Sequence, residues 1–146
     1  MFAIAIVIRR LKEGKTYEDF RKAWFHTTGF ATSSKLYTVI NAFDPREIIV
    51  IGFTETNIDD FQKTLEIDVK ERLENPLDAV VEIDNITRKF GLLVSEDDFS
   101  APGKINYKPA AVGGHEMDLE HFSDDLHKIA DMIKAASKKR DSLKNE

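Results

Sequence analysis

The sequence predicts an α+β fold with one antiparallel sheet and a helix near the C-terminal end. Three observations favour this fold. Patterns typical of strands and helices follow one another in the order strand, helix, strand, strand, helix, strand over residues 1–94. A hairpin turn joins the two middle strands. A further helical pattern begins near residue 118, after an irregular stretch at 95–117. We therefore divide the chain into a domain at 1–94 and an extended segment with a C-terminal helix at 95–146.

The first strand and the first helix lie within residues 2–29. The run FAIAIVI at 2–8 is short and rich in β-branched residues, which is typical of a buried strand. KEGK at 12–15 predicts a turn. Thr16 is a suitable helix N-cap, and Asp19 three residues later supplies the acidic half of a capping box. We expect the helix to continue to about residue 27 and to end near residue 29.

The second and third strands form the predicted hairpin. KLYTVINAF at 35–43 and EIIVIGFTE at 47–55 are strong strand patterns, and DPRE between them suits a type I turn. A second helix should begin at the N-cap Asn57 and end before the Pro at position 76. AVVEIDNIT at 79–87 predicts the fourth strand, which could continue through FGLLV at 90–94.

The resulting order, βαββαβ, is that of ferredoxin-like domains. Such a domain places both helices on one face of its antiparallel sheet. The opposite face would remain apolar, holding Val7 and Val39 or their neighbours. Because an uncovered apolar sheet face is too large for a monomer, either the C-terminal segment or a second copy of the chain should cover it. We expect a homodimer or a higher homo-oligomer.

The first predicted helix carries Phe20 and Trp24, and Thr28, Gly29 and Phe30 follow at its end. This spacing resembles the dimeric α+β barrel superfamily, most closely its EthD-like and NIPSNAP-like proteins, where Phe, then Trp, then His-Gly-Pro often occur at these intervals. Thr28 stands here in place of the histidine, and Phe30 in place of the proline. The resemblance implies a homodimer in which two sheets enclose a cavity in each subunit, lined by the sheet face away from the helices. It also implies a cofactor-independent monooxygenase or a related enzyme of small ligands, and relatives that handle haem add a third possibility.

Polar residues within apolar strand patterns are the candidates for ligand binding, because a buried polar group needs a partner. The strand patterns contain Arg9, Asn41, Glu82 and Asp84. An equally simple interpretation places these residues at strand ends in water. With the aromatic and hydroxyl candidates added, the predicted ligand-binding residues are Arg9, Trp24, Thr28, Tyr37 and Asn41. Packing in the core is the alternative role for Trp24 and Tyr37. No residue is predicted to be catalytic.

The histidines of the chain do not indicate a catalytic or metal-binding site. His26 should point away from the helix face that carries Phe20 and Trp24, which favours a solvated side chain. A group of acidic residues and histidines at 115–127 could supply metal ligands from Glu120, Asp124 and His127, but a solvated polar helix face explains it better. We therefore predict no metal and no cofactor. No Ser-His-Asp set and no phosphate-binding loop is evident in the sequence.

The composition excludes several classes of function. The net charge is −5, which disfavours nucleic acid as a partner. The chain has no cysteine, which excludes disulfides and thiolate chemistry. The apolar run at the start is too short to span a bilayer. We expect a cytoplasmic protein that binds neither nucleic acid nor membrane.

The C-terminal helix, predicted at 118–136, has a narrow apolar seam. Its residues recur at steps of three and four: Leu119, Phe122, Leu126, Ile129, Ile133 and Ala136. The seam either docks on its own domain or forms an arm that contacts a second subunit or another partner. Two functions therefore remain open. The first is binding of a small apolar or aromatic molecule in a barrel cavity; the alternative is a non-enzymatic dimerisation or interaction protein that uses the last helix as a contact arm.

Overall fold

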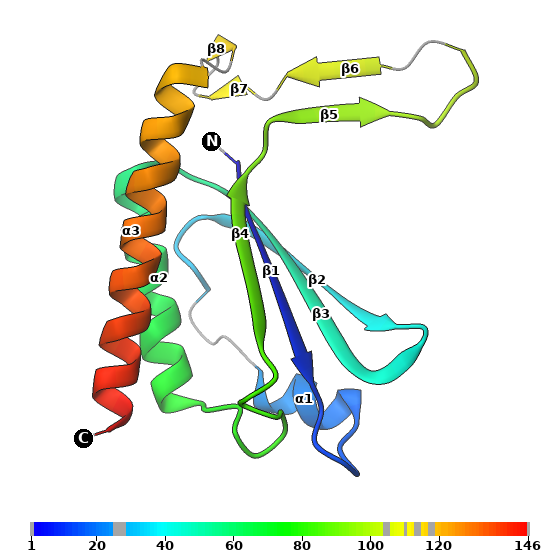
Figure 1. Cartoon of the computed structure of the whole chain (residues 1–146), viewed down its shortest axis with the longest axis vertical. Helices are drawn as coiled ribbons and strands as arrows, with labels where there is room; N and C mark the ends of the chain where they lie inside the picture. Colours follow the sequence, from blue (N-terminus) through cyan, green and yellow to red (C-terminus); the bar gives the residue numbers. More distant parts are fainter. Residues whose placement is uncertain are drawn as a thin grey trace.

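The computed structural model describes residues 2–24, 29–103, 106–109, 111–112, 115–116 and 119–145, with side chains described at 2–24, 29–103 and 123–145. Four strands form an antiparallel sheet in the order β2-β3-β1-β4 (Figure 1). These strands are β1 (Phe2–Arg10), β2 (Ser33–Asn41), β3 (Asp44–Glu55) and β4 (Thr87–Leu92). The helices are α1 (Tyr17–Ala23), α2 (Ile58–Glu74) and α3 (Leu119–Lys144). The predicted α+β class with an antiparallel sheet is confirmed, and the arrangement is compatible with a ferredoxin-like fold.

All three helices pack on one face of the sheet, which we call the helix-covered face. Phe20 of α1 is fully buried against Ile48 and Val50 of β3. Phe61 of α2 and Ile129 of α3 bury Ala3 of β1 in a second cluster. The pairing register puts these strand residues on the same side of the sheet, because neighbours opposite one another share a face.

Helix α1 begins as the sequence predicts and ends earlier. The side chain of Thr16 accepts a hydrogen bond from the backbone N–H of Asp19, and the carboxylate of Asp19 accepts one from the backbone N–H of Thr16 at 2.8 Å. This capping box lowers the pKa of Asp19, first through the backbone hydrogen bond from Thr16. The helix ends at Ala23 with Trp24 as its C-cap. The predicted positions of His26 and Thr28 lie outside the described residues.

The hairpin between β2 and β3 is confirmed, but its turn lies earlier in the chain than predicted. The turn residues are Ala42 and Phe43, and Asp44 already pairs with Asn41. The side-chain oxygen of Asn41 accepts a hydrogen bond from the backbone N–H of Phe43 at 2.9 Å, which stabilises this two-residue turn. Asp44 forms an ion pair with Arg10 of the neighbouring strand. The DPRE segment is therefore the start of a strand and not the turn.

The prediction of a fourth strand at 79–87 was wrong. Residues 78–86 form turns with a single bridge between Val81 and Leu11, and β4 spans Thr87–Leu92. Val80 and Val81 are buried beneath α1 in the cluster around Phe20. Their apolar character therefore reflects core packing of a loop. A short apolar run by itself does not distinguish this role from a strand.

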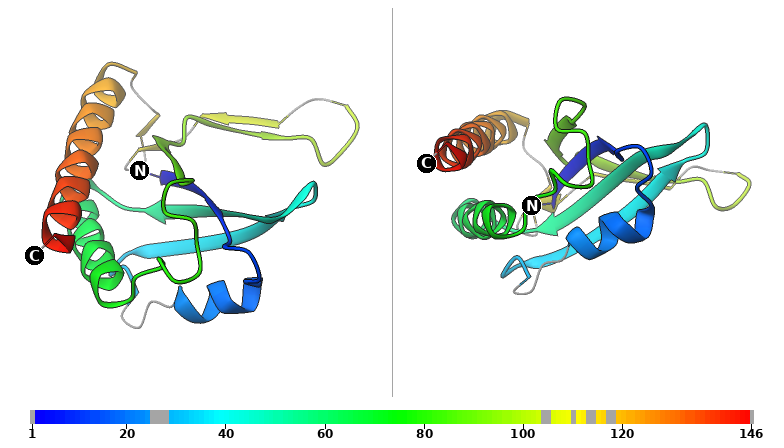
Figure 2. Two further views of the ribbon diagram at one scale, coloured as in Figure 1. Left: turned by 60° about the horizontal axis from the view of Figure 1, so that its bottom comes forward. Right: turned by 90° about the horizontal axis from the view of Figure 1, so that it is seen from below.

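The segment between the sheet and α3 contains short strands where the sequence predicted irregular structure. β5 (Ser95–Asp98) pairs with β6 (Asn106–Pro109), and β7 (Ala111–Val112) pairs with β8 (His115–Glu116). The β5–β6 pair projects away from the helices (Figures 1 and 2). Whether a domain boundary falls at residue 94 stays a prediction.

Helix α3 docks on its own chain, one of the two alternatives that the sequence left open. It runs beside α2 in the same direction (Figures 1 and 2), with Ile129 against Phe61 near one end and Lys144 near Asp78 at the other. Ile129, in the middle of the predicted seam, is fully buried. Among the described residues, no helix has the length and apolar character needed to cross a membrane.

The other side of the sheet, which we call the open face, is largely apolar, and no helix of the described residues covers it. Its apolar residues are Phe2, Ile4, Ile6, Ile8, Tyr37, Val39, Ile49, Ile51 and Phe53. Lys35, Thr87 and Lys89 lie on the same face. Tyr37 and Val39 are 54% and 44% exposed. The expectation that Val39 lies on an uncovered face agrees with this arrangement. Val7 belongs instead to the helix-covered face, because it pairs with Val50.

Candidate functional site

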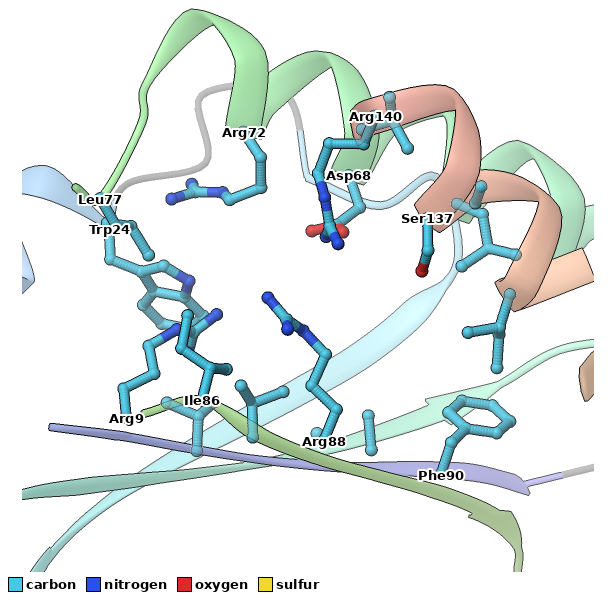
Figure 3. A pocket seen from close by; sticks show the side chains of 18 of the residues that line it. Arg9, Trp24, Asp68, Arg72, Leu77, Ile86, Arg88, Phe90, Ser137 and Arg140 are labelled. Atoms are coloured by element: carbon cyan, nitrogen blue, oxygen red, sulfur yellow. The ribbon is translucent and has the colours of Figure 1, made fainter. Parts of the chain in front are cut away.

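A cavity of about 450 Å³ lies between the helix-covered face and helices α2 and α3 (Figure 3). Strand β1 contributes small side chains to its wall, Ala3 and Ala5, and β3 contributes Gly52. Large residues at these three positions would fill the space between the sheet and the helices. The alternation of Ala with Phe and Ile in FAIAIVI therefore produces two different faces: small residues toward the cavity and bulky residues on the open face.

Arg9 comes from the end of β1 and points into the cavity (Figure 3). It is only 8% exposed, and its guanidinium lies over the ring of Phe20, with 5.9 Å between Cζ and the ring centroid. Its Nη1 has no hydrogen-bond partner among the described residues. Burial lowers the pKa of Arg9 to about 10, and the nearby positive charges of Arg88 and Arg72 add to this effect.

Arg72 reaches the cavity from α2, on the side opposite Arg9 (Figure 3). It is also 8% exposed. Its Nη1 donates a hydrogen bond to the backbone carbonyl of Asn75 at 3.2 Å. Its Nε and Nη2 have no hydrogen-bond partner in the described part of the chain, and the nearest carboxylate oxygen, of Glu71, lies 4.0 Å from Nη2. Burial lowers the pKa of Arg72.

Two more arginines extend the cationic lining. Arg88 of β4 and Arg140 of α3 point toward Asp68 of α2 (Figure 3). The Nε of Arg140 also lies 3.6 Å from the Oδ1 of its neighbour Asp141. Among the described residues, five basic side chains (Arg9, Arg72, Arg88, Arg140 and Lys144) and three acidic ones belong to the cavity, since Lys89 pairs with Ile6 and so lies on the open face. The excess is two positive charges, in a chain whose net charge is −5. The charge of this cavity therefore opposes that of the whole protein.

Aromatic and aliphatic side chains form the rest of the lining. Trp24 stacks on Phe20 with 5.7 Å between the ring centroids, and it also lines the cavity. Phe61 and Phe90 contact one another farther along the sheet, with 5.3 Å between their ring centroids. Leu36 and Ile133 lie on the strand and helix sides. The cavity thus combines an apolar wall with a set of cationic groups.

The structure brings together two of the five residues that the sequence proposed for ligand binding, Arg9 and Trp24. Tyr37 lies on the open face, where its ring contacts that of Phe53 edge to face, with 5.9 Å between the ring centroids. Asn41 belongs to the hairpin, where its Nδ2 donates to Glu47 at 3.0 Å. Thr28 lies outside the described residues. The cavity is on the helix-covered face, whereas the resemblance to barrel proteins led us to expect one on the opposite face.

The two further polar candidates, Glu82 and Asp84, both lie in the 78–86 loop. Glu82 accepts a hydrogen bond from Arg46 at 2.9 Å and lies 3.8 Å from Arg10. It therefore connects the 78–86 loop to strands β1 and β3. Asp84 is exposed in the same loop.

Sequence reasoning did not identify Arg72, Arg88 and Arg140, although each carries a signal. Arg72 follows Val69 by three residues on the apolar stripe of α2, and Arg140 follows Ala136 by four on the seam of α3. Arg88 precedes Phe90 by two residues in β4 and so shares its face. A basic residue that continues an apolar stripe could have indicated this cluster.

A scan against protein-family models and searches of curated proteins and of solved structures find no significant match for this chain. Within the described ranges, no group of three or more His, Cys, Asp or Glu residues is placed to hold a metal ion. Asp124 and His127 of the candidate metal group lie in α3, whereas the side chain of Glu120 is outside the described part.

Proposed function

We propose that this protein binds a small molecule with an apolar or aromatic body in the cavity between its sheet and helices α2 and α3. The observation that carries the proposal is the cavity of about 450 Å³ with its wall of aromatic and aliphatic side chains. Ligand sites in proteins commonly have volumes of about 300–1,000 Å³, an apolar lining and a few convergent polar groups. The position of Trp24 in the wall supports the proposal further, because a tryptophan offers a large flat surface to an aromatic ligand.

The test is uptake of a neutral apolar fluorophore, N-phenylnaphthylamine, whose emission rises on entering an apolar site. Two adjacent alanines of α3 provide matched variants, because Ala136 lines the cavity whereas Ala135 is exposed. Ala136→Phe should abolish uptake by filling the cavity, and Ala135→Phe should leave it unchanged. Ser137→Phe, at a second lining position, repeats the test if Ala136→Phe does not fold. Equal uptake by the folded lining variants and by Ala135→Phe would overturn the proposal.

A second proposal concerns the open face, on which we expect a second copy of the chain to pack. Strands of about nine residues span roughly 30 Å, and four strands span roughly 19 Å, so the face measures about 570 Å². Two such faces together bury about 1,100 Å², close to the lower end of the roughly 1,200–2,000 Å² of stable interfaces. The exposure of Phe2, Tyr37 and Val39 supports pairing of identical faces, because apolar patches of several hundred Å² often serve as interaction sites. This homodimer is the assembly that the barrel resemblance implies.

The proposal is limited to binding. Arginines and an aspartate hold and orient a ligand through charge and hydrogen bonds. The EthD-like resemblance, a monooxygenase reaction and an interaction role for α3 beyond its own chain stay predictions, as does the cytoplasmic location.

A further inference from the structure

We propose that the ligand of this cavity is an organic anion, whose phosphate or carboxylate group is bound by Arg72 and Arg9 while its apolar body lies against the aromatic wall. The inference rests on the proposed function and adds the chemical class of the ligand.

The hydrogen-bond donors of Arg72 support an anion of a particular shape. Nη1 is held by the carbonyl of Asn75, which leaves Nε and Nη2 without a partner among the described residues. These two nitrogens form one edge of the planar guanidinium, and their N–H bonds are nearly parallel. Two oxygens of one carboxylate or phosphate match this edge, which is the bidentate geometry that arginine favours. Arg9 adds a third donor, Nη1, from the opposite side of the cavity.

Contacts within the protein do not account for these donors. Burial lowers the pKa of Arg72, and the charges of Asp68 and Glu71 both raise it. The Oε1 of Glu71 accepts a hydrogen bond from the Nδ2 of Asn75 at 3.0 Å and lies 4.0 Å from Nη2 of Arg72, and neither carboxylate accepts a hydrogen bond from Nε or Nη2. The ring of Phe20 stabilises Arg9 through a cation–π contact, which supplies no hydrogen-bond acceptor for Nη1. Burying a guanidinium whose N–H groups lack acceptors costs several kcal/mol. An anion that enters the cavity removes this cost at both arginines.

The balance of charges in the cavity lining also favours an anionic ligand. Arg88 and Arg140 point toward Asp68 (Figure 3). Asp78 lies 3.9 Å from the ammonium of Lys144, and Asp141 lies 3.6 Å from the guanidinium of Arg140. These three carboxylates oppose the five basic side chains on the cavity side of the sheet. A ligand with two negative charges neutralises this excess, and a ligand with one negative charge halves it. Because the cavity is much larger than a bare phosphate, the ligand also needs an apolar body to contact Trp24 and Phe90.

The experiment compares anionic and neutral ligands of matched shape by isothermal titration calorimetry. Naphthyl phosphate is paired with naphthol, and naphthoate with naphthalenemethanol; inorganic phosphate is the control without an apolar body. We expect the phosphate or the carboxylate to bind at least about tenfold more tightly than its neutral partner, as a charge-assisted bidentate contact predicts. Inorganic phosphate should bind more weakly than naphthyl phosphate. Which anion shows the larger preference distinguishes a phosphate ligand from a carboxylate ligand.

Arginine variants test the assignment of the anion to this cluster. Arg72→Met should remove most of the preference for the anion, and Arg72→Lys, which keeps the charge but loses the two-donor edge, should remove part of it. Arg21→Met is the matched control, because Arg21 is exposed on α1 and outside the cavity lining. If Arg72→Met fails to fold, as judged by circular dichroism, Arg9→Met provides the same test.

The outcomes separate this inference from the proposed function. If the neutral fluorophore enters the cavity but anions bind no more tightly than neutral partners, the inference is wrong and the proposed function stands. If the anions bind equally well to the Arg72, Arg9 and Arg21 variants, the inference is also wrong, because the binding site then lies elsewhere. If neither the fluorophore nor any of the paired ligands binds, the proposed function itself fails.

Discussion

The two faces of the sheet differ from one another, and each departs from the usual arrangement of a soluble antiparallel sheet. Such sheets commonly bury an apolar face and leave a polar face in water. Here the helix-covered face holds Arg9 and Arg88 around a cavity, whereas the open face presents isoleucines, Tyr37 and Val39. Charges in a covered cavity and apolar groups on an uncovered face both increase the free energy of an isolated monomer. From this difference we infer that each face has its own partner, an anionic ligand on one side and a second copy of the chain on the other.

The buried core of the covered side and the exposed hairpin turn should differ most in their contribution to stability. Phe20 is fully buried between α1 and β3, whereas Phe43 at the hairpin turn is 98% exposed. We expect Phe20→Ala to lower the free energy of unfolding by about 4 kcal/mol, because the substitution removes a buried ring and leaves a cavity. Phe43→Ala should change it by less than about 0.5 kcal/mol. Urea denaturation of both variants measures the difference, and similar losses would contradict the placement of α1 on the sheet.

Val39→Asp tests the role of the open face. The carboxylate would lie within the proposed interface, on the edge strand β2, so we expect the dimer dissociation constant to rise about 100-fold or more, consistent with burial of an unpaired charge. Phe43→Asp is the control, since it also replaces an exposed apolar residue but lies at the hairpin turn. Sedimentation velocity at several concentrations gives the assembly state of each protein. A wild-type protein that remains monomeric at micromolar concentration would rule out the dimer.

Arg9→Met gives the smallest expected change, and its direction is informative. A buried cation that serves ligand binding reduces the stability of the free protein, so replacing it with an apolar side chain of similar length should raise the free energy of unfolding by about 1 kcal/mol. Arg21→Met on the surface should change it by less than about 0.5 kcal/mol. Both values come from urea denaturation of the ligand-free protein. A clear loss of stability in Arg9→Met would show that this arginine has a structural role instead.

Local patterns in the sequence were sufficient for many elements of the fold. Thr16 and Asn57 cap α1 and α2 as predicted, because capping depends on a side chain and a backbone group only two or three residues apart. The order of the first three strands and the first two helices follows from periodicity over a few turns. The seam of α3 likewise identified Ile129 as a position that must be buried. Each of these features depends on residues that are close together in the chain.

Contacts between distant segments decided the rest. Residues 79–86 have the composition of a strand, but Val80 and Val81 fill a space beneath α1 that exists only once the sheet and helix are assembled. The hairpin turn lies at Ala42 and Phe43, where Asn41 and the Arg10–Asp44 ion pair stabilise it. Neither the loop structure of residues 79–86 nor the position of the hairpin turn can be predicted from its own short segment, since the competing local structures differ little in energy.

The candidate site shows the same division. The sequence alone singled out Arg9 and Trp24, because a charge in a strand and an aromatic residue on a helix stripe are visible locally. Only the tertiary structure brings Arg72, Arg88 and Arg140 to the same cavity from α2, β4 and α3. It also decides that Tyr37 and Asn41 lie elsewhere, because the face of the sheet that a residue occupies depends on strand register and on which side the helices pack. Electrostatic interactions act through space between groups far apart in the chain, so the charge of this cavity is a property of the folded protein and not of any one segment.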